Sequence, residues 1–192
     1  ESAFSNSWKQ LGDIISELET FGIADINSIL MQYMYYIRTI NHETISDTGA
    51  VNVTTPGLRR YFTEINKGPI SDPLKMCTDM IKLSKIWKKV SDYPQIKVLL
   101  KFNENSKLFL ASYFFRFNEE DITAEIVEPI VDCLLRLFSL LELGDAGYSS
   151  KYFKTFLFKE EAKFSDETIP VEEIKTDFYQ HIISNWDYDT ID

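Results

Sequence analysis

The segment from Asp121 to Leu143, DITAEIVEPIVDCLLRLFSLLEL, constrains the fold more than any other part of the sequence. Its apolar residues recur at helical spacing, and beyond Pro129 they fall on nearly every side of the expected helix. A helix that is apolar all round needs other elements to cover it all round. We therefore expect this segment to be the central helix, with Pro129 either kinking it or lying in its first turn.

Other helices are predicted from the same periodicity and from residues that begin and end helices. Asp72-Pro73 and Thr55-Pro56 each place a capping side chain before a proline, which is typical of a helix N-terminus. Ser7 is a candidate cap for a helix that ends at Gly22. The expected helices cover residues 7–21, 24–40, 55–67, 72–91, 96–117 (as one or two helices), 121–143, 148–158 and 170–185.

Composition agrees with an all-α fold. Seven Gly and six Pro among 192 residues leave little material for the many turns of a β-rich fold, and the 44% apolar content can form a sizeable core. We predict a single compact bundle of about eight helices over residues 1–192, around a central, almost wholly apolar helix. Because the chain begins with Glu rather than Met, we expect it to be a fragment of a longer multidomain protein.

Residue patterns that hold metals, cofactors or catalytic groups are missing from the sequence. The two cysteines, Cys77 and Cys133, lie in apolar runs that suit small buried residues. The sequence contains no CxxC, HExxH, GxSxG, GxGxxG or P-loop pattern. We therefore predict no metal, no cofactor and no catalytic residue, and expect this segment not to be an enzyme.

The cellular location follows from two further patterns. No run approaches the roughly 18 apolar residues of a membrane-spanning helix, and the N-terminal ESAFSNSWKQ lacks the pattern of a signal peptide. We expect a cytoplasmic protein without a membrane partner.

Charge is distributed unevenly along the chain. The formal net charge is −10, yet residues 59–101 hold ten basic and four acidic residues. On the helix expected at 72–91, Lys75, Lys82, Lys85 and Lys89 fall within a stripe of about 80°. We call these four residues the lysine stripe. Arg59 and Arg60 precede the stripe on the neighbouring expected helix.

Two interpretations of the lysine stripe are open. Unpaired lysines can neutralise nucleic-acid phosphates, which positions a protein on DNA without reading sequence. The same pattern is typical of the solvated face of an ordinary amphipathic helix, and the negative net charge favours this second interpretation. The candidate DNA-contacting residues are Arg59, Arg60, Lys75, Lys82, Lys85 and Lys89.

The pentapeptide RTINH, from Arg38 to His42, is similar to the Arg-x(4–6)-His signature of HEPN ribonucleases. In that family the pair forms a metal-independent RNA-cleaving site at a dimer interface. Here the spacing is one residue shorter than the shortest usual spacing, although an i, i+4 pair does share a helix face. A HEPN-like ribonuclease is therefore kept as the enzymatic alternative.

Two stretches resemble the helical segment of GmrSD-type restriction proteins. The first is LMQYMYYIRTI followed after a gap by GLRRYF, and the second runs from LKFNENSKLFLASYFFRF through the Leu-rich segment to YSSKYFKTFLF. The resemblance covers about residues 8–160 and rests on hydrophobic patterns. Full-length members of that family carry a ParB/sulfiredoxin-like nucleotide-hydrolysing domain with a DGQQR-like motif, and many carry an HNH nuclease domain. Neither motif occurs in this chain.

The resemblance implies a non-catalytic helical module of a modification-dependent restriction or phage-defence protein in bacteria. Such a module would link or assemble the nucleotide-hydrolysing and nuclease parts and would contact the DNA backbone through residues 59–101. Its partners would be other domains or subunits of the same protein. A different kind of function is the alternative: a protein-interaction domain without a nucleic-acid role, whose contact surfaces would be the acidic N- and C-terminal segments.

Overall fold

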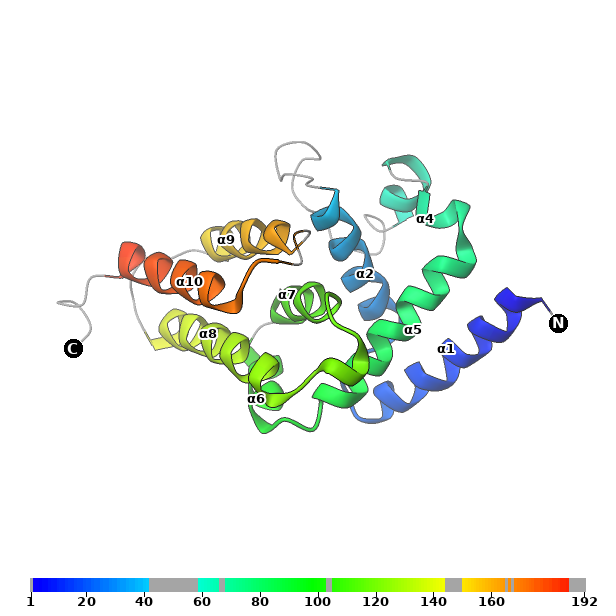
Figure 1. Ribbon diagram of the computed structural model, residues 1–192, viewed down its shortest axis with the longest axis horizontal. Coiled ribbons are helices and arrows are strands. Elements are labelled where there is room, and N and C mark those ends of the chain that lie inside the picture. The colour runs from blue at the N-terminus through cyan, green and yellow to red at the C-terminus, as the bar shows by residue number, and fades with distance from the viewer. Residues whose placement is uncertain are drawn as a thin grey trace.

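The computed structural model describes residues 2–41, 59–65, 68–102, 105–143, 150–164, 166 and 168–186, and these residues form an all-α structure (Figure 1). Eight α-helices of nine or more residues lie within the described ranges, which confirms the predicted bundle of about eight helices. They are α1 Ala3–Thr20, α2 Ile26–Ile40, α5 Pro73–Val90, α6 Pro94–Phe102, α7 Asn105–Phe114, α8 Ala124–Leu143, α9 Ser150–Lys163 and α10 Val171–Asn185. Shorter elements are a π-helical turn η1 (Tyr61–Ile65), α4 (Gly68–Ser71) and a 3₁₀ turn η2 (Glu119–Asp121).

Side-chain caps fix the beginnings of α5 and α2. The Asp72 carboxylate accepts a hydrogen bond of 2.9 Å from the backbone N–H of Lys75, and Pro73 occupies the first turn, as the sequence predicts. The Asp25 carboxylate accepts a 2.7 Å bond from the N–H of Ser28 in the same way. Each cap satisfies a donor that the first turn of a helix leaves without a partner.

Helix α1 begins earlier than the sequence pattern indicates. The predicted start at Ser7 is wrong, because α1 begins at Ala3. The hydroxyl of Ser2 accepts a 3.2 Å bond from the N–H of Ser5 and so caps the helix before its first apolar turn. The predicted helix start at Thr55-Pro56 lies outside the described residues.

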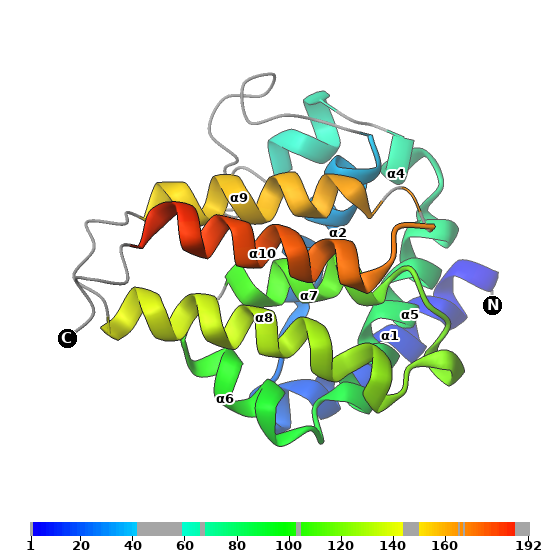
Figure 2. The ribbon, with the colours of Figure 1, turned by 60° about the vertical axis from the view of Figure 1, so that its left-hand side comes forward.

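Helix α7 lies in the middle of the assembly of helices. In Figure 2 the three helices α8, α9 and α10 run side by side, with α7 behind them. Helix α7 packs against α9 on this side and against α2, α5 and α6 on others. Helix α1 packs along α5 at the outer edge of the molecule (Figure 1).

Burial distinguishes α7 from α8, the expected central helix. Eight of the ten residues of α7 are buried, including the serines at 106 and 112. Helix α8 is buried along one broad face through residues such as Ile130 and Leu134, but Glu128, Asp132 and Arg136 form an exposed row at i, i+4 spacing. The all-round burial predicted for the segment 121–143 is therefore not what the structure shows. Among the described helices, none is long and apolar enough to cross a bilayer.

Aromatic rings connect α7 to the two C-terminal helices. The ring of Phe109 lies edge-on to Phe164, with centroids 5.3 Å apart, and to Phe178, with centroids 5.6 Å apart. Such edge-to-face pairs stabilise a core beyond their area of burial, each by about 0.5–1.5 kcal/mol. Cys77 and Cys133 are buried free thiols within the same core, as predicted.

Candidate functional site

Lys75, the first residue of the lysine stripe, carries an ion pair. Its Nζ lies 2.8 Å from Oδ2 of Asp79, one helical turn further along α5. The same Asp79 oxygen accepts a 3.2 Å hydrogen bond from the hydroxyl of Tyr33 on α2. The expectation that Lys75 is unpaired is therefore wrong.

Lys82 and Lys89 hold the segment that follows α7. The Lys82 ammonium donates a 2.9 Å hydrogen bond to the backbone carbonyl of Phe115 and lies 4.5 Å from the centroid of the Phe115 ring. This carbonyl lies at the C-terminal end of α7, where helices leave acceptors without partners and where a cation is stabilised. The Lys89 ammonium donates a 2.5 Å bond to the carbonyl of Glu119 in η2. Both side chains are half-buried and therefore act within the fold.

The other three predicted DNA-contacting residues are Lys85 of the lysine stripe and the two arginines, Arg59 and Arg60. Lys85 is half-buried, and within the described ranges it makes no hydrogen bond or ion pair. Arg59 and Arg60 are exposed and directly precede η1. The Nε of Arg60 lies 3.3 Å from the carboxylate of Glu64, an exposed i, i+4 pair.

The RTINH motif is only partly within the described residues. Arg38 is 3% exposed in the interior of the single chain, with its guanidinium carbon 5.6 Å from the centroid of the Tyr61 ring. His42 lies outside the described residues. An interfacial ribonuclease site requires the arginine at the surface, and Arg38 is not there.

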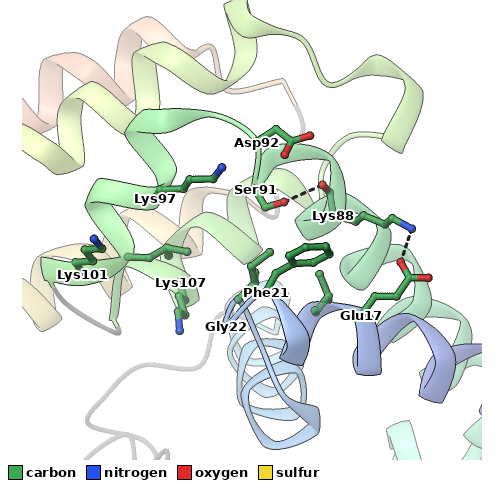
Figure 3. Close-up of a pocket in the computed structure, with 12 residues that line it drawn as sticks. Glu17, Phe21, Gly22, Lys88, Ser91, Asp92, Lys97, Lys101 and Lys107 are labelled. Carbon is green, nitrogen blue, oxygen red and sulfur yellow. Dashed lines mark hydrogen bonds and ion pairs between the residues drawn. The ribbon is translucent and has the colours of Figure 1, made fainter.

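A cleft of about 660 Å³ opens where the end of α1, the end of α5, α6 and the start of α7 meet (Figure 3). Its volume lies within the range of small-ligand sites. We call it the lysine cleft. Its lining residues are Glu17, Leu18, Phe21, Gly22, Ile23, Lys88, Ser91, Asp92, Lys97, Leu100, Lys101 and Lys107.

One wall of the lysine cleft is the turn that ends α1. The N–H of Gly22 donates to the carbonyl of Glu19, and the N–H of Ile23 donates to the carbonyl of Leu18, both at 2.9 Å. This pair of bonds is a Schellman motif, which requires a left-handed residue that glycine adopts at little cost; Gly22 has φ +67°. The motif holds Phe21 at the C-cap with 73% of its surface exposed. Gly22 thus ends α1, as predicted, and fixes the position of an exposed ring.

Helix α6 supplies the opposite wall. Ile96 and Leu99 are completely buried, and α6 packs through them toward α8. Lys97 and Lys101, spaced i, i+4, share a neighbouring face and line the lysine cleft. Both are exposed, and neither makes a hydrogen bond or ion pair within the described part of the chain.

The lysine cleft is positive within an acidic chain. Four lysines, contributed by α5, α6 and α7, line it together with two acids, Glu17 and Asp92. The Lys88 ammonium forms an ion pair with the Glu17 carboxylate, so α5 and α1 are joined at the rim. Asp92 is the second acid among the lining residues. A concave surface with charge of one sign concentrates ligands of the opposite sign.

Acidic groups elsewhere are buried between helices. Glu160 and Glu161 on α9 are 4% and 2% exposed. Burial raises the pKa of Glu160 to about 7, against the opposing attraction of Lys163, and burial raises the pKa of Glu161 well above its usual value. Within the described residues, no group of three or more His, Cys, Asp or Glu side chains is placed to hold a metal ion.

The lysine cleft and the lysine stripe draw on the same basic segment of the sequence but mainly on different helices. Lys97 and Lys101 lie inside the basic segment 59–101, and their i, i+4 spacing was visible in the sequence. Lys107 lies outside that segment, and Phe21 is more than sixty positions from the nearest cleft lysine in the chain. Only the packing of α1 along α5 brings the Phe21 turn to the lysines.

Comparisons of the chain with models of known protein families, with curated proteins and with solved structures found no match in any of the three.

Proposed function

We propose that the lysine cleft binds the phosphate backbone of nucleic acid. The observation that carries this proposal is that one cleft is lined by Lys88, Lys97, Lys101 and Lys107 in a chain of net charge −10. Ammonium groups from three helices match a ligand with several closely spaced negative charges. The residues that line the cleft offer positive charge and an aromatic ring. These groups suit the binding and positioning of a nucleic-acid strand.

We further propose that the chain acts as the non-catalytic helical module of a GmrSD-like restriction or phage-defence protein. The second stretch that resembles this family begins at Leu100, near the end of α6, and continues through α7 and α8 into α9, so Lys101 and Lys107 of the lysine cleft lie inside the family-like region. In this role, backbone contact would hold DNA while other domains or subunits hydrolyse nucleotide and cut. A DGQQR-like motif in the full-length reading frame would support the family assignment.

Backbone binding has a characteristic salt dependence. Each neutralised phosphate releases condensed counterions, so about three lysine contacts give a slope of about −2 to −3 for the logarithm of affinity against the logarithm of salt concentration. We expect fluorescence anisotropy with a labelled oligonucleotide to show this slope at low salt.

Charge reversal locates the binding surface. The double variant Lys97→Glu/Lys101→Glu should weaken binding at low salt by at least about ten-fold and flatten the salt slope. The matched control is Lys9→Glu/Lys154→Glu, which reverses the same charge at exposed lysines on α1 and α9 that do not line the cleft. Equal losses in the two variants would show only a general charge effect. No binding by the unmodified protein would favour the alternative of a protein-interaction domain.

A further inference from the structure

We infer that the lysine cleft takes single-stranded nucleic acid, with an unpaired base stacked on Phe21. This inference rests on the proposed backbone binding and names its substrate class. Phe21 has the largest exposed fraction, 73%, among the large aromatic side chains of the described residues; Tyr179 and Tyr152 follow at 58% and 57%. The ring is therefore available to a ligand.

The backbone that carries the exposed ring is fixed by a hydrogen-bonded turn. Two 2.9 Å backbone hydrogen bonds, from Gly22 to Glu19 and from Ile23 to Leu18, close the turn around it. Leu18 is 1% exposed, so the turn is anchored in the core. An aromatic side chain has only two rotatable bonds, so a ring on a fixed turn loses little conformational freedom when it contacts a ligand, and this favours binding.

Lysines lie on two sides of the Phe21 ring (Figure 3). Figure 3 shows Phe21 among the lining residues, with the Lys88–Glu17 pair on one side and Lys97, Lys101 and Lys107 on the other. A base stacked on Phe21 would place its own and the neighbouring phosphates near these ammonium groups. Aromatic platforms flanked by positive charge are how proteins bind single strands with little sequence preference.

The shape of the cleft favours a single strand over a duplex. In a duplex the base faces are stacked on one another, and only base edges are accessible in the grooves. A hollow of about 660 Å³ has the size of a small-ligand site and can admit a nucleotide that is splayed out of a strand. A duplex could offer its phosphates to Lys97 and Lys101 but could not offer a base face to Phe21.

The test compares single-stranded and duplex oligonucleotides of equal length and matched sequence by fluorescence anisotropy. We expect the unmodified protein to bind the single strand more tightly. Phe21→Ala should weaken single-strand binding by about ten-fold or more, leave duplex binding within about two-fold, and keep the same salt slope. An abasic strand with the same number of phosphates should bind the unmodified protein as weakly as the normal strand binds Phe21→Ala.

Controls separate the outcomes. Phe21→Trp retains a stacking face and should preserve single-strand binding, and the melting temperature of each variant checks the fold. Equal losses of single-strand and duplex binding in Phe21→Ala, no loss at all, or tighter binding of duplex would overturn this inference while leaving backbone binding intact. If the unmodified protein bound neither oligonucleotide, or if Lys97→Glu/Lys101→Glu did not weaken binding, the proposed function itself would be overturned.

Discussion

Lysines on α5 and α6 belong to the same basic segment of the sequence but occupy opposite environments. Lys82 and Lys89 on α5 direct their ammonium groups to backbone carbonyls of Phe115 and Glu119. Lys97 and Lys101 on α6 line the lysine cleft. Both pairs carry the same charge, and the two lysines of each pair share a face of their helix, at i, i+7 on α5 and at i, i+4 on α6. What differs is whether a helix end or solvent lies opposite the lysine, and this decides whether the charge stabilises the fold or is available to a ligand.

The largest effect that would test this comparison is the loss of the two α5 lysines. Lys82→Met/Lys89→Met keeps the aliphatic stems and removes the ammonium donors from two carbonyls. Hydrogen bonds from charged groups contribute about 1.5–3 kcal/mol each, and half-burial reduces this, so we expect a loss of about 2–4 kcal/mol in the free energy of unfolding. Urea denaturation followed by circular dichroism measures it.

The matched control for this double variant is Lys97→Met/Lys101→Met on α6. Because these side chains are exposed on the cleft wall, the change in stability should stay within about 0.5 kcal/mol. A similar loss in both variants would contradict the assignment of different roles to the two pairs.

The next largest effect is expected from replacing the buried acid Glu160, which should change how the free energy of unfolding depends on pH. Its pKa is raised to about 7 in the folded protein, chiefly by burial, from 4.5 in the unfolded chain. The folded state therefore holds the proton more tightly, and the contribution of Glu160 to stability declines as pH rises from about 4.5 to about 7. Glu160→Gln should be close to the unmodified protein at pH 4 and more stable by about 1–2 kcal/mol at pH 8.

Urea denaturation across this pH range gives the difference between Glu160→Gln and the unmodified protein. Lys163 stays paired with Asp177 on α10 in the variant, so its charge keeps a partner. Glu172→Gln is the control, because Glu172 is 75% exposed beside Lys175 and its loss should add no comparable pH-dependent difference. If Glu160→Gln were less stable at pH 8 than at pH 4 relative to the unmodified protein, burial would not be the dominant influence on Glu160.

The start of α5 and the end of α1 could be predicted from the sequence because their signals are local. Asp72 and Pro73 begin α5, and Gly22 ends α1, through contacts within four or five residues. The identity of the buried central helix could not be predicted in the same way. Helix α7 is short and contains two serines, and its burial depends on the helices around it. The row Glu128, Asp132 and Arg136 was a local signal that α8 has an exposed side.

Tertiary packing also determines which charged side chains are available to a ligand. A helical projection places Lys75, Lys82, Lys85 and Lys89 on one face, but it does not contain the end of α7, which lies against that face. For the same reason the lysine cleft could not be predicted, because its walls come from residues 17–23, 88–101 and 107. A sequence pattern gives the direction of a side chain from its own helix and not the group that it meets.

The smallest effect would come from Lys75, which shares the α5 stripe with Lys82 and Lys89 but points to solvent. Its side chain is 67% exposed, and its partner Asp79 keeps the hydrogen bond from Tyr33 when the lysine is removed. The Asp79 side chain is 14% exposed, but ion pairs with a solvent-exposed partner contribute only about 0.2–1 kcal/mol, so Lys75→Ala should lower the free energy of unfolding by no more than about 1 kcal/mol. High salt should remove even this difference, whereas the loss in Lys82→Met/Lys89→Met should persist, because buried or half-buried contacts are screened less. A large, salt-independent loss in Lys75→Ala would show that position on the stripe, and not the group opposite each lysine, determines its role.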